Sequence, residues 1–322
     1  MKISSWICLM CCIAFTGSAS AFNSQVTAGI ERWDWSEDYE EDSGFTREGD
    51  YAQDKFFVGY TYFLSPVEDN GEPLDLLPFF FSRSSYVYGN FYAGERDFDL
   101  EDSDYNSEKD WTGLGLGGFF YFMPDTGIGA GLFTEDGDWK EDDAVEDDTY
   151  DEDHDGWHIS ARHYLNDLNR LSIRLSETDR ERDFASDFER SDTYRWLILS
   201  YAGVMGESPN FFLGADIGDG SREKDDSDDN EVDHDLIKLG VTMGPVYRNF
   251  AIYFSWDYYE WDPDGDGWEA DETFYTISPR YWFSEQLMLG GDLTYWSWDE
   301  SGNNYDFEES GTGIEILLRY RF

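Results

Sequence analysis

The stretch Thr312-Gly313-Ile314-Glu315-Ile316-Leu317-Leu318-Arg319-Tyr320-Arg321-Phe322 decides the fold, because its side chains alternate with a period of two. One face carries Thr, Ile, Leu, Tyr and Phe, and the opposite face is largely Gly, Glu and Arg. A period of two is that of a β-strand, whose successive side chains point to opposite sides of a sheet. This strand therefore has one apolar face and one mostly polar face.

The same alternation recurs along the chain. In the stretch from Phe250 to Asp257, for example, Phe250, Ile252 and Phe254 share one face, and polar residues occupy part of the other. No segment keeps the i, i+3, i+4, i+7 spacing of an amphipathic helix, so the sequence predicts an all-β fold. The other clear examples are Val26/Ala28/Ile30, Leu114/Leu116, Leu171/Ile173/Leu175, Phe211/Leu213/Ala215/Ile217, Ile237/Leu239/Val241/Met243 and Leu287/Leu289.

Two kinds of connection alternate between these stretches. Long acidic connections lie near residues 36–54, 95–110, 135–155, 177–192, 216–235, 257–272 and 299–309. Short turns such as Pro124–Gly127 and Asn166–Asn169 separate them, and Ser65–Pro78 is a longer member of the short class. This asymmetry is typical of a transmembrane antiparallel β-barrel with long outer loops and short periplasmic turns.

Counting the segments between the connections predicts fourteen strands. An even number places both chain ends on the periplasmic side. The predicted strands lie near 25–35, 55–64, 79–94, 111–123, 128–135, 156–165, 170–178, 193–204, 211–218, 235–246, 250–259, 273–283, 286–298 and 310–322.

The end of the last strand carries a specific signature. A terminal Phe322, preceded at alternating positions by Tyr320 and Leu318, resembles the last-strand signal of bacterial outer-membrane proteins. That resemblance implies an outer-membrane location, recognition of this strand by the barrel-assembly machinery, and periplasmic chaperones as partners. The chain resembles general porins of Gram-negative bacteria, which implies passive diffusion of small hydrophilic solutes. No substrate-binding motif of any one porin family is present.

The first residues predict a secretory signal peptide at 1–21, leaving the barrel at 22–322. Lys2 precedes an apolar stretch from Trp6 to Phe15, and Ala19-Ser20-Ala21 supplies the small residues of a cleavage site. A lipoprotein signal around Leu9–Cys12 is the alternative. The three cysteines all lie in this segment, so the mature chain is predicted to contain no disulfide. No later run of 18 apolar residues predicts a spanning helix.

Charge and aromatic content exclude other classes of protein. The 322 residues carry a formal charge of −49, and 19% of them are aromatic. Such an acidic chain lacks the cations needed for non-specific nucleic-acid binding, and its aromatic content is too high for a disordered acidic chain. Most acidic residues fall in the long connections, which predicts an acidic outer rim. That rim would concentrate divalent cations beside lipopolysaccharide and outer-membrane lipid.

If the apolar faces contact lipid, the charged residues between them line the interior. They either pair with one another as solvated wall residues or form a track for anionic solutes. The candidates are Glu31, Arg83, Arg162, Arg174, Arg195, Asp216, Lys238, Arg280, Asp292, Glu315 and Arg319.

Tryptophan and tyrosine residues near the predicted strand ends are interpreted as interfacial girdles. An aromatic slide for sugars inside the pore is the functional alternative. The residues concerned are Trp33, Trp35, Trp111, Trp157, Trp196, Trp256, Trp282, Trp296, Trp298 and Tyr320.

Two loops contain an Asp-x-Asp-x-Asp-Gly pattern that resembles the start of an EF-hand calcium loop. One is Asp262, Asp264 and Asp266, and the other runs from Asp151 to Gly156. The closing Glu of such a loop is replaced by Thr273 and Arg162. The sequence therefore predicts at most weak Ca²⁺ binding, and no other cofactor.

An enzyme is not predicted. The four histidines, at positions 154, 158, 163 and 234, have no nucleophile motif such as G-x-S-x-G beside them. The remaining alternatives are a non-conducting structural or adhesive barrel, a barrel enzyme of another kind, and a soluble β-sandwich or propeller. The solute, the gating and the oligomeric state stay open at this stage.

Overall fold

The structure is a computed structural model, and most of the chain from residue 21 onward is described in it. The predicted signal peptide therefore lies outside the described residues, except for Ala21, which begins the first strand. The described residues are 21–41, 46–68, 72–76, 80–81, 83–100, 106–142, 147–184, 189–206, 210–226, 230–263, 269–302 and 305–322.

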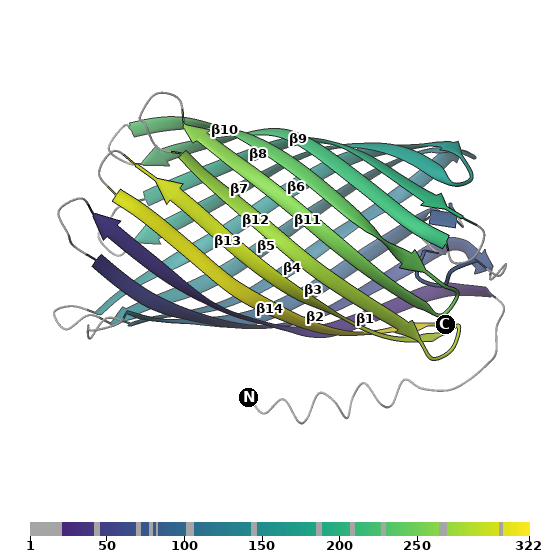
Figure 1. The fold of residues 1–322 in the computed structure, drawn as a ribbon, viewed down its shortest axis with the longest axis horizontal. Helices are drawn as coiled ribbons and strands as arrows, with labels where there is room; N and C mark the ends of the chain where they lie inside the picture. Colours follow the sequence, from purple (N-terminus) through teal and green to yellow (C-terminus); the bar gives the residue numbers. More distant parts are fainter. Residues whose placement is uncertain are drawn as a thin grey trace.

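The described residues form fourteen strands in one closed antiparallel barrel (Figure 1). Each strand pairs with its neighbours in sequence, and the first pairs with the last. The predicted fold and strand number are confirmed. The strands are β1 (Ala21–Glu41), β2 (Thr46–Glu68), β3 (Tyr86–Leu100), β4 (Asn106–Met123), β5 (Thr126–Asp142), β6 (Asp147–Asn166), β7 (Asn169–Phe184), β8 (Glu189–Met205), β9 (Asn210–Asp226), β10 (Asn230–Val246), β11 (Phe250–Pro263), β12 (Glu269–Trp282), β13 (Leu287–Ser301) and β14 (Tyr305–Arg321).

The end of the barrel that carries the short turns is here called the turn end. Large apolar side chains cover the outside of the barrel near it. On the last strand, Ile314 and Ile316 are 55% and 50% exposed, as the alternation of that strand predicts. Leu114 and Leu116 on β4 and Leu132 on β5 belong to the same outward surface. Exposed apolar residues in an unbroken belt are favourable only against hydrocarbon, so this outward apolar band contacts lipid.

The strands are much longer than a membrane crossing requires. β2 has 23 residues, whereas about 9–11 tilted residues cross a bilayer. Paired strand continues through residues 36–41 and 46–54, which the sequence predicted to be loop. The prediction of long acidic loops is therefore wrong in extent. Above the apolar band the strands continue as a hydrogen-bonded tube, here called the projecting wall.

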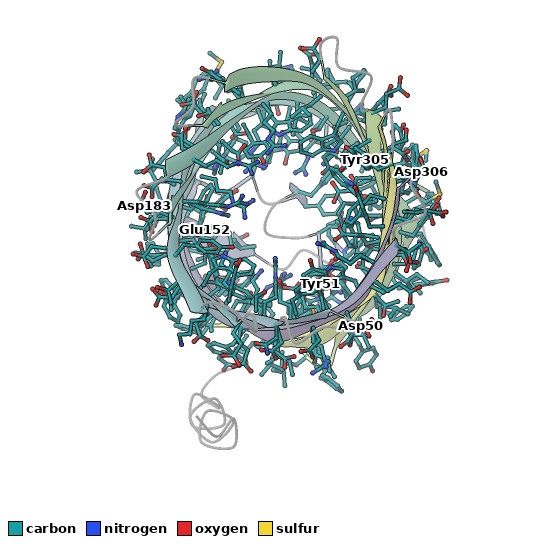
Figure 2. All side chains as sticks on the ribbon, turned by 90° about the vertical axis from the view of Figure 1, so that its left-hand side faces the viewer. Asp50, Tyr51, Glu152, Asp183, Tyr305 and Asp306 are labelled. Atoms are coloured by element: carbon teal, nitrogen blue, oxygen red, sulfur yellow. The ribbon has the colours of Figure 1, made fainter. Side chains whose placement is uncertain are left out.

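Inward and outward side chains differ in kind on the projecting wall. Figure 2 shows Tyr51 and Glu152 on the inner side of the barrel, whereas Asp50, Asp183 and Asp306 lie on the outer side. The outward-facing positions on the paired strands of the projecting wall are mostly Asp and Glu. The acidic excess of the chain is therefore carried largely by the outer face of a sheet.

The turn end holds the C-terminus and the first described residues. Gln25 of β1 pairs with Arg321 of β14, and the amide of Phe322 donates to the carbonyl of Ser24 at 2.9 Å. The start of β1 and the end of β14 therefore lie at the same end of the barrel, as an even strand number requires (Figure 1). Among the described residues there is no helix long and apolar enough to cross a membrane.

The apolar band gives a direct test of the barrel's orientation toward lipid. Leu132→Arg should lower the free energy of unfolding in lipid vesicles by about 2–4 kcal/mol, because it places a cation in hydrocarbon. Asp136→Arg, on the same face four residues toward the loop end, should cause no loss. Urea titrations of both variants would measure the difference. Equal stability of the two would contradict the position of the band.

Candidate functional site: the barrel interior

The interior contains most of the charged residues that the sequence predicted to line it. Arg174 lies between the outward Ile173 and Leu175, and Lys238 lies between the outward Ile237 and Leu239. The same alternation turns the other members inward. The inward-facing residues of the predicted set are Glu31, Arg162, Arg174, Asp216, Lys238, Arg280, Asp292, Glu315 and Arg319.

Arg195 does not face the interior. It lies on the same face of β8 as Leu197 and Leu199, which belong to the outward band. Its guanidinium pairs with Glu177 at 2.7 Å and with Glu223 at 2.9 Å, on the outside of the projecting wall. The prediction that Arg195 lines the interior is therefore wrong.

Arg83 does not belong to any strand of the wall. It precedes β3 with a positive φ of 49°. Its guanidinium contacts Asp125 and Asp167, in the turns that follow β4 and β6, and lies 4.3 Å from the ring centre of Tyr164. Arg83 therefore fastens the turn end, and its prediction as a wall residue is wrong.

Four interior cations in the part of the barrel below the projecting wall have a carboxylate partner. These contacts match the interpretation of mutually paired wall residues. The ion pairs are Arg280–Asp292 at 2.7 Å, Lys55–Glu31 at 3.2 Å, Lys238–Asp257 at 3.4 Å and Arg319–Asp75 at 3.4 Å.

Arg174 differs from these pairs. Its side chain is exposed on the inward face of β7, opposite Ser160 of β6 and Ile198 of β8. Within the described ranges of the chain, no carboxylate lies at ion-pair distance from it. Arg174 is therefore an uncompensated positive charge that faces the lumen.

A segment between β2 and β3 enters the barrel at the turn end. We call its described residues, 72–76, 80–81 and 83–85, the crossing segment. Its backbone is held from two sides: the amide of Leu74 donates to the backbone carbonyl of Arg248 at 3.0 Å, and the guanidinium of Arg321 donates to the carbonyl of Leu74 at 2.8 Å. The hydroxyl of Tyr253 donates to Asp75 at 2.8 Å. The stretch Ser65–Pro78, predicted as a longer member of the short connections, is instead strand as far as Glu68, and its described residues 72–76 belong to the crossing segment.

Apolar side chains of the crossing segment pack against opposite parts of the wall. Leu74 packs with Trp282 and Met288, near β12 and β13. Phe80 packs with Val204 on β8, and its carbonyl accepts a hydrogen bond from Tyr164 at 2.8 Å. The crossing segment therefore spans the interior from side to side and narrows the barrel at its turn end.

Most tryptophans predicted to form interfacial girdles lie inside the barrel. Only Trp157, Trp256 and Tyr320 of that set face outward. The girdle prediction is wrong for the others, because the alternation of their strands turns these side chains toward the interior. The inward members are Trp33, Trp35, Trp111, Trp196, Trp282, Trp296 and Trp298.

Inward rings contact one another around much of the wall. We call this series the aromatic chain; it joins β3, β2, β1, β13, β12, β11 and β8. It corresponds in placement to the aromatic slide that the sequence left as an alternative. The contacts, by ring-centre distance, are Phe98–Tyr51 at 4.2 Å, Tyr51–Trp35 at 4.7 Å, Trp35–Trp296 at 6.3 Å, Trp296–Phe274 at 6.4 Å, Phe274–Tyr259 at 6.1 Å and Tyr259–Trp196 at 5.9 Å.

Glycines make room for inward rings against the wall. A Cβ atom on Gly113 would overlap the ring of Tyr92, and one on Gly313 would overlap the ring of Trp33. Each ring therefore rests on a neighbouring strand where no side chain stands, a known arrangement of paired aromatic and glycine residues in sheets. The rings cover backbone and take up little of the lumen.

A set of cations lines the interior of the projecting wall, and we call it the basic belt. At its centre are two carboxylates, Glu152 and Asp192, each only 1% exposed. Glu152 pairs with Lys109 at 2.5 Å and Arg182 at 2.8 Å, and Asp192 pairs with Arg222 at 2.8 Å. The members of the belt are Arg96, Lys109, Arg180, Arg182, Arg190 and Arg222.

The sequence did not reveal the basic belt because its members lie in segments read as loops. Arg180 and Arg182 continue the inward parity of Arg174 along β7. Extending the period of two through residues 177–184 would have placed both side chains inside. That alternation was the available signal.

The calcium-like pattern at Asp151, Asp153 and Asp155 is not a loop. These residues lie along β6, point outward and have paired backbone on both sides. Extended strand cannot wrap a cation as an EF-hand loop does. Asp264 and Asp266 lie outside the described residues, and so does the side chain of Asp262. The described residues contain no group of three potential metal ligands.

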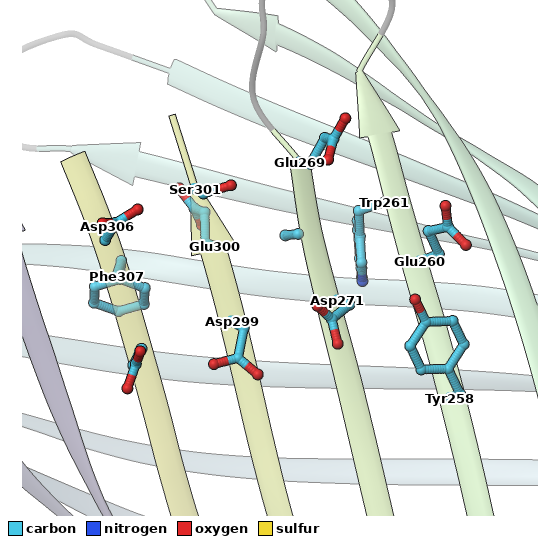
Figure 3. A pocket seen from close by; sticks show the side chains of 12 residues that line it. Tyr258, Glu260, Trp261, Glu269, Asp271, Asp299, Glu300, Ser301, Asp306 and Phe307 are labelled. Atoms are coloured by element: carbon cyan, nitrogen blue, oxygen red, sulfur yellow. The ribbon is translucent and has the colours of Figure 1, made fainter. Parts of the chain in front are cut away.

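Carboxylates form rows on the outside of the projecting wall. Glu260, Asp271, Asp299 and Glu308 lie directly opposite one another across β11 to β14. They line an open pocket of about 430 Å³ that Trp261 also borders (Figure 3). Because like charges directly opposite each other destabilise a sheet, this row raises the free energy of the folded wall. The acidic residues predicted for an outer rim thus lie largely on strands.

Arg280 supplies a hydrogen-bond donor where the strand pairing of the wall is interrupted. Pro279 has no amide hydrogen, and the pairing of β12 with β13 is interrupted at this point. The guanidinium of Arg280 donates to the carbonyl of Gly291 at 2.5 Å and pairs with Asp292. A side chain thus replaces the missing backbone donor, which makes Arg280 a structural residue as well as an interior cation.

This role can be tested with a double-mutant cycle. Arg280→Ala should lower the free energy of unfolding in lipid vesicles by about 1–3 kcal/mol, because the carbonyl of Gly291 loses its donor. In a Pro279→Val background the loss should be smaller, since a backbone amide returns. Equal losses in both backgrounds, measured by urea unfolding, would contradict the role.

Comparison with known proteins identifies a fold but no family. No family model matches the sequence, and no curated protein matches it. Solved structures do match: the TodX monoaromatic hydrocarbon channel deltaS2 mutant has a TM-score of 0.64 at 8% identity, covering 94% of this chain and 91% of that chain. A FadL homologue of Pseudomonas aeruginosa has a TM-score of 0.56 at 8% identity, with coverages of 93% and 90%.

Outer membrane protein Omp33 of Acinetobacter baumannii matches with a TM-score of 0.50 at 11% identity, covering 95% of this chain and 100% of that chain. At these identities the likeness concerns the fold. A closed antiparallel barrel with an outward apolar band is a membrane-spanning structure. Together, the band and the shared fold place this chain in the bacterial outer membrane, as a β-barrel protein.

Proposed function

We propose that the chain is an outer-membrane channel for the passive diffusion of small hydrophilic solutes. The observation that carries the proposal is the polar interior of a closed barrel, with charges of both signs on its wall. Opposed wall charges hold water and impose a field across the path of a solute. Arg174, which has no carboxylate at ion-pair distance in the described structure, biases that field toward anions.

The route narrows before it reaches the periplasm. The crossing segment lies at the turn end, and Asp75 links it to Tyr253 at 2.8 Å and to Arg319 at 3.4 Å. A segment fastened to several strands sets a size limit for solutes. We therefore propose diffusion limited by a constriction at the turn end, with the wider projecting wall as the entrance.

A second candidate is a channel for apolar aromatic solutes. The aromatic chain inside the barrel favours it, because rings such as Trp35 and Trp196 face the interior. The solved TodX structure, which is titled a monoaromatic hydrocarbon channel, shares the fold. Toluene uptake into vesicles containing the protein would support this candidate over the hydrophilic one.

Partners follow from the surfaces at the two ends of the barrel. We propose that the outward face formed by Leu318, Tyr320 and Phe322 is read by the barrel-assembly machinery after delivery by periplasmic chaperones. Leu318 and Phe322 are 37% and 49% exposed on that face, and Tyr320 stacks on Phe322. We also propose that the outer carboxylate rows lie beside lipopolysaccharide with divalent cations between them.

Recordings in planar lipid bilayers test the channel. The purified full chain should give discrete conductance steps, which a non-conducting structural or adhesive barrel would lack. Arg174→Ala should shift the reversal potential in a salt gradient toward cation selectivity, because it removes an uncompensated lumenal cation. Arg195→Ala is the matched control, since Arg195 lies on the outer face, and it should leave selectivity unchanged.

The absence of conductance steps would contradict the channel itself. Conductance with equal selectivity in the wild type and in Arg174→Ala would contradict only the assigned role of Arg174. The two results are therefore distinguishable in one set of recordings.

The constriction has its own test. Asp75→Ala should raise the unitary conductance, because the crossing segment loses its contacts with Tyr253 and Arg319. Asp34→Ala, an outward substitution on β1, serves as the control. Single-channel recordings would measure both variants, and an unchanged conductance in Asp75→Ala would argue that another part of the barrel limits flow.

A further inference from the structure

Among the described residues, the basic belt contains more positive than negative charge. Six cations contribute to it, from β3, β4, β7, β8 and β9. Lys109 contacts Glu135 and Glu152, Arg180 and Arg182 share Glu152, and Arg190 and Arg222 share Asp192. Each central carboxylate is buried, so the excess positive charge lies on the lumenal side of the belt.

The carboxylate at the centre of the belt cannot compensate further cations. One oxygen of Glu152 accepts Lys109 and His154, and the other accepts Arg180 and Arg182. Both oxygens are therefore shared between two donors. Positive charges that are partly withdrawn from water and incompletely paired raise the free energy of the folded state. An anion arriving from the lumen would offset that cost.

Arg96 shows the same imbalance most clearly. Its guanidinium donates two hydrogen bonds to Gln53, at 3.1 and 2.8 Å, and it lies 5.2 Å from the ring centre of Trp35. No carboxylate of the described residues lies at ion-pair distance from it. Arg96 therefore brings a full charge to the belt with only neutral neighbours in direct contact.

The chemistry of the belt favours oxyanions over halides. Guanidinium groups present paired N–H donors that match the two oxygens of a carboxylate. The aromatic residues beside the belt add a second preference. Trp139 lies under both Lys109 and Arg96, at 5.4 and 6.0 Å, and stacks on Tyr150. A planar carbon skeleton can contact such rings, whereas an inorganic anion cannot.

We propose that the basic belt is a binding site for small organic carboxylates that carry a planar ring. It rests on the proposed channel function only in that the solute reaches the belt through the open outer end. The carboxylate is held by Arg96, Arg180 and Arg182, and its ring lies against the neighbouring aromatic residues. The site concentrates such anions in the entrance, above Arg174 and the constriction.

Isothermal titration calorimetry of the folded full chain in detergent tests the site, with benzoate as the probe. Benzamide, which is neutral and of the same shape, is the control ligand. Benzoate should bind and benzamide should not. The double variant Arg180→Gln/Arg182→Gln should weaken benzoate binding by about tenfold or more, because it removes charge-assisted hydrogen bonds. Arg195→Gln, on the outer face, should bind as the wild type does.

A second variant separates loss of binding from misfolding. It is needed because Arg180 and Arg182 both donate hydrogen bonds to Glu152. Arg96→Gln leaves every ion pair of the belt intact and should also weaken benzoate binding. Equal binding of benzoate and benzamide, or wild-type affinity in both variants, would overturn the proposal. Phosphate binding as tight as that of benzoate would overturn the assignment to organic carboxylates.

Calorimetry does not depend on conductance, so the two proposals can fail separately. Benzoate binding by a chain that shows no conductance steps would support the site and contradict the channel. In a conducting chain, benzoate should reduce the current in a concentration-dependent manner, and Arg96→Gln should relieve that block. Block that persists unchanged in this variant would count against the belt as the binding site.

Discussion

Backbone pairing in a medium without water constrains everything else in this molecule. A peptide group facing hydrocarbon must find its hydrogen-bond partner inside the protein, and a sheet satisfies that demand only when it closes on itself. β1 closes it along the whole length of β14, from Gln25 opposite Arg321 to Glu41 opposite Tyr305. Arg280 shows how strict the demand is, because its guanidinium donates to Gly291 where Pro279 interrupts the pairing.

Closure also creates two surfaces with different chemistry. The outer surface changes from an apolar band to rows of carboxylates, and the inner surface holds the aromatic chain and the basic belt. The many glycines and aromatic residues of the composition belong together in this arrangement, since rings such as Tyr92 and Trp33 rest on glycines of the next strand. Cations lie over several of these rings, as Arg96 does over Trp35. Rings and cations thus line the inner face of the wall and do not fill the interior.

The strand segments that carry the apolar band were predictable from the sequence. The acidic segments that form the projecting wall were predictable only in part. Stretches such as Phe250–Asp257 alternate clearly, and they gave the strand number and the outward face. Acidic residues have low strand propensity, so segments such as 177–192 read as loop although pairing with neighbours makes most of that range strand. That error hid Arg180 and Arg182. The contacts of the crossing segment, such as Asp75 with Arg319, join residues far apart in sequence and leave no local pattern.

The projecting wall has a consequence for how the cell surface meets its surroundings. Proteases cut segments that can be drawn into an extended, unpaired conformation, and a residue whose backbone is bonded on both sides must first open locally. The acidic composition suggests flexible loops. Most of the acidic residues lie instead in such paired backbone, as Asp151 does between β5 and β7. The exposed part of this protein should therefore persist in a proteolytic environment as a stiff, carboxylate-covered cylinder.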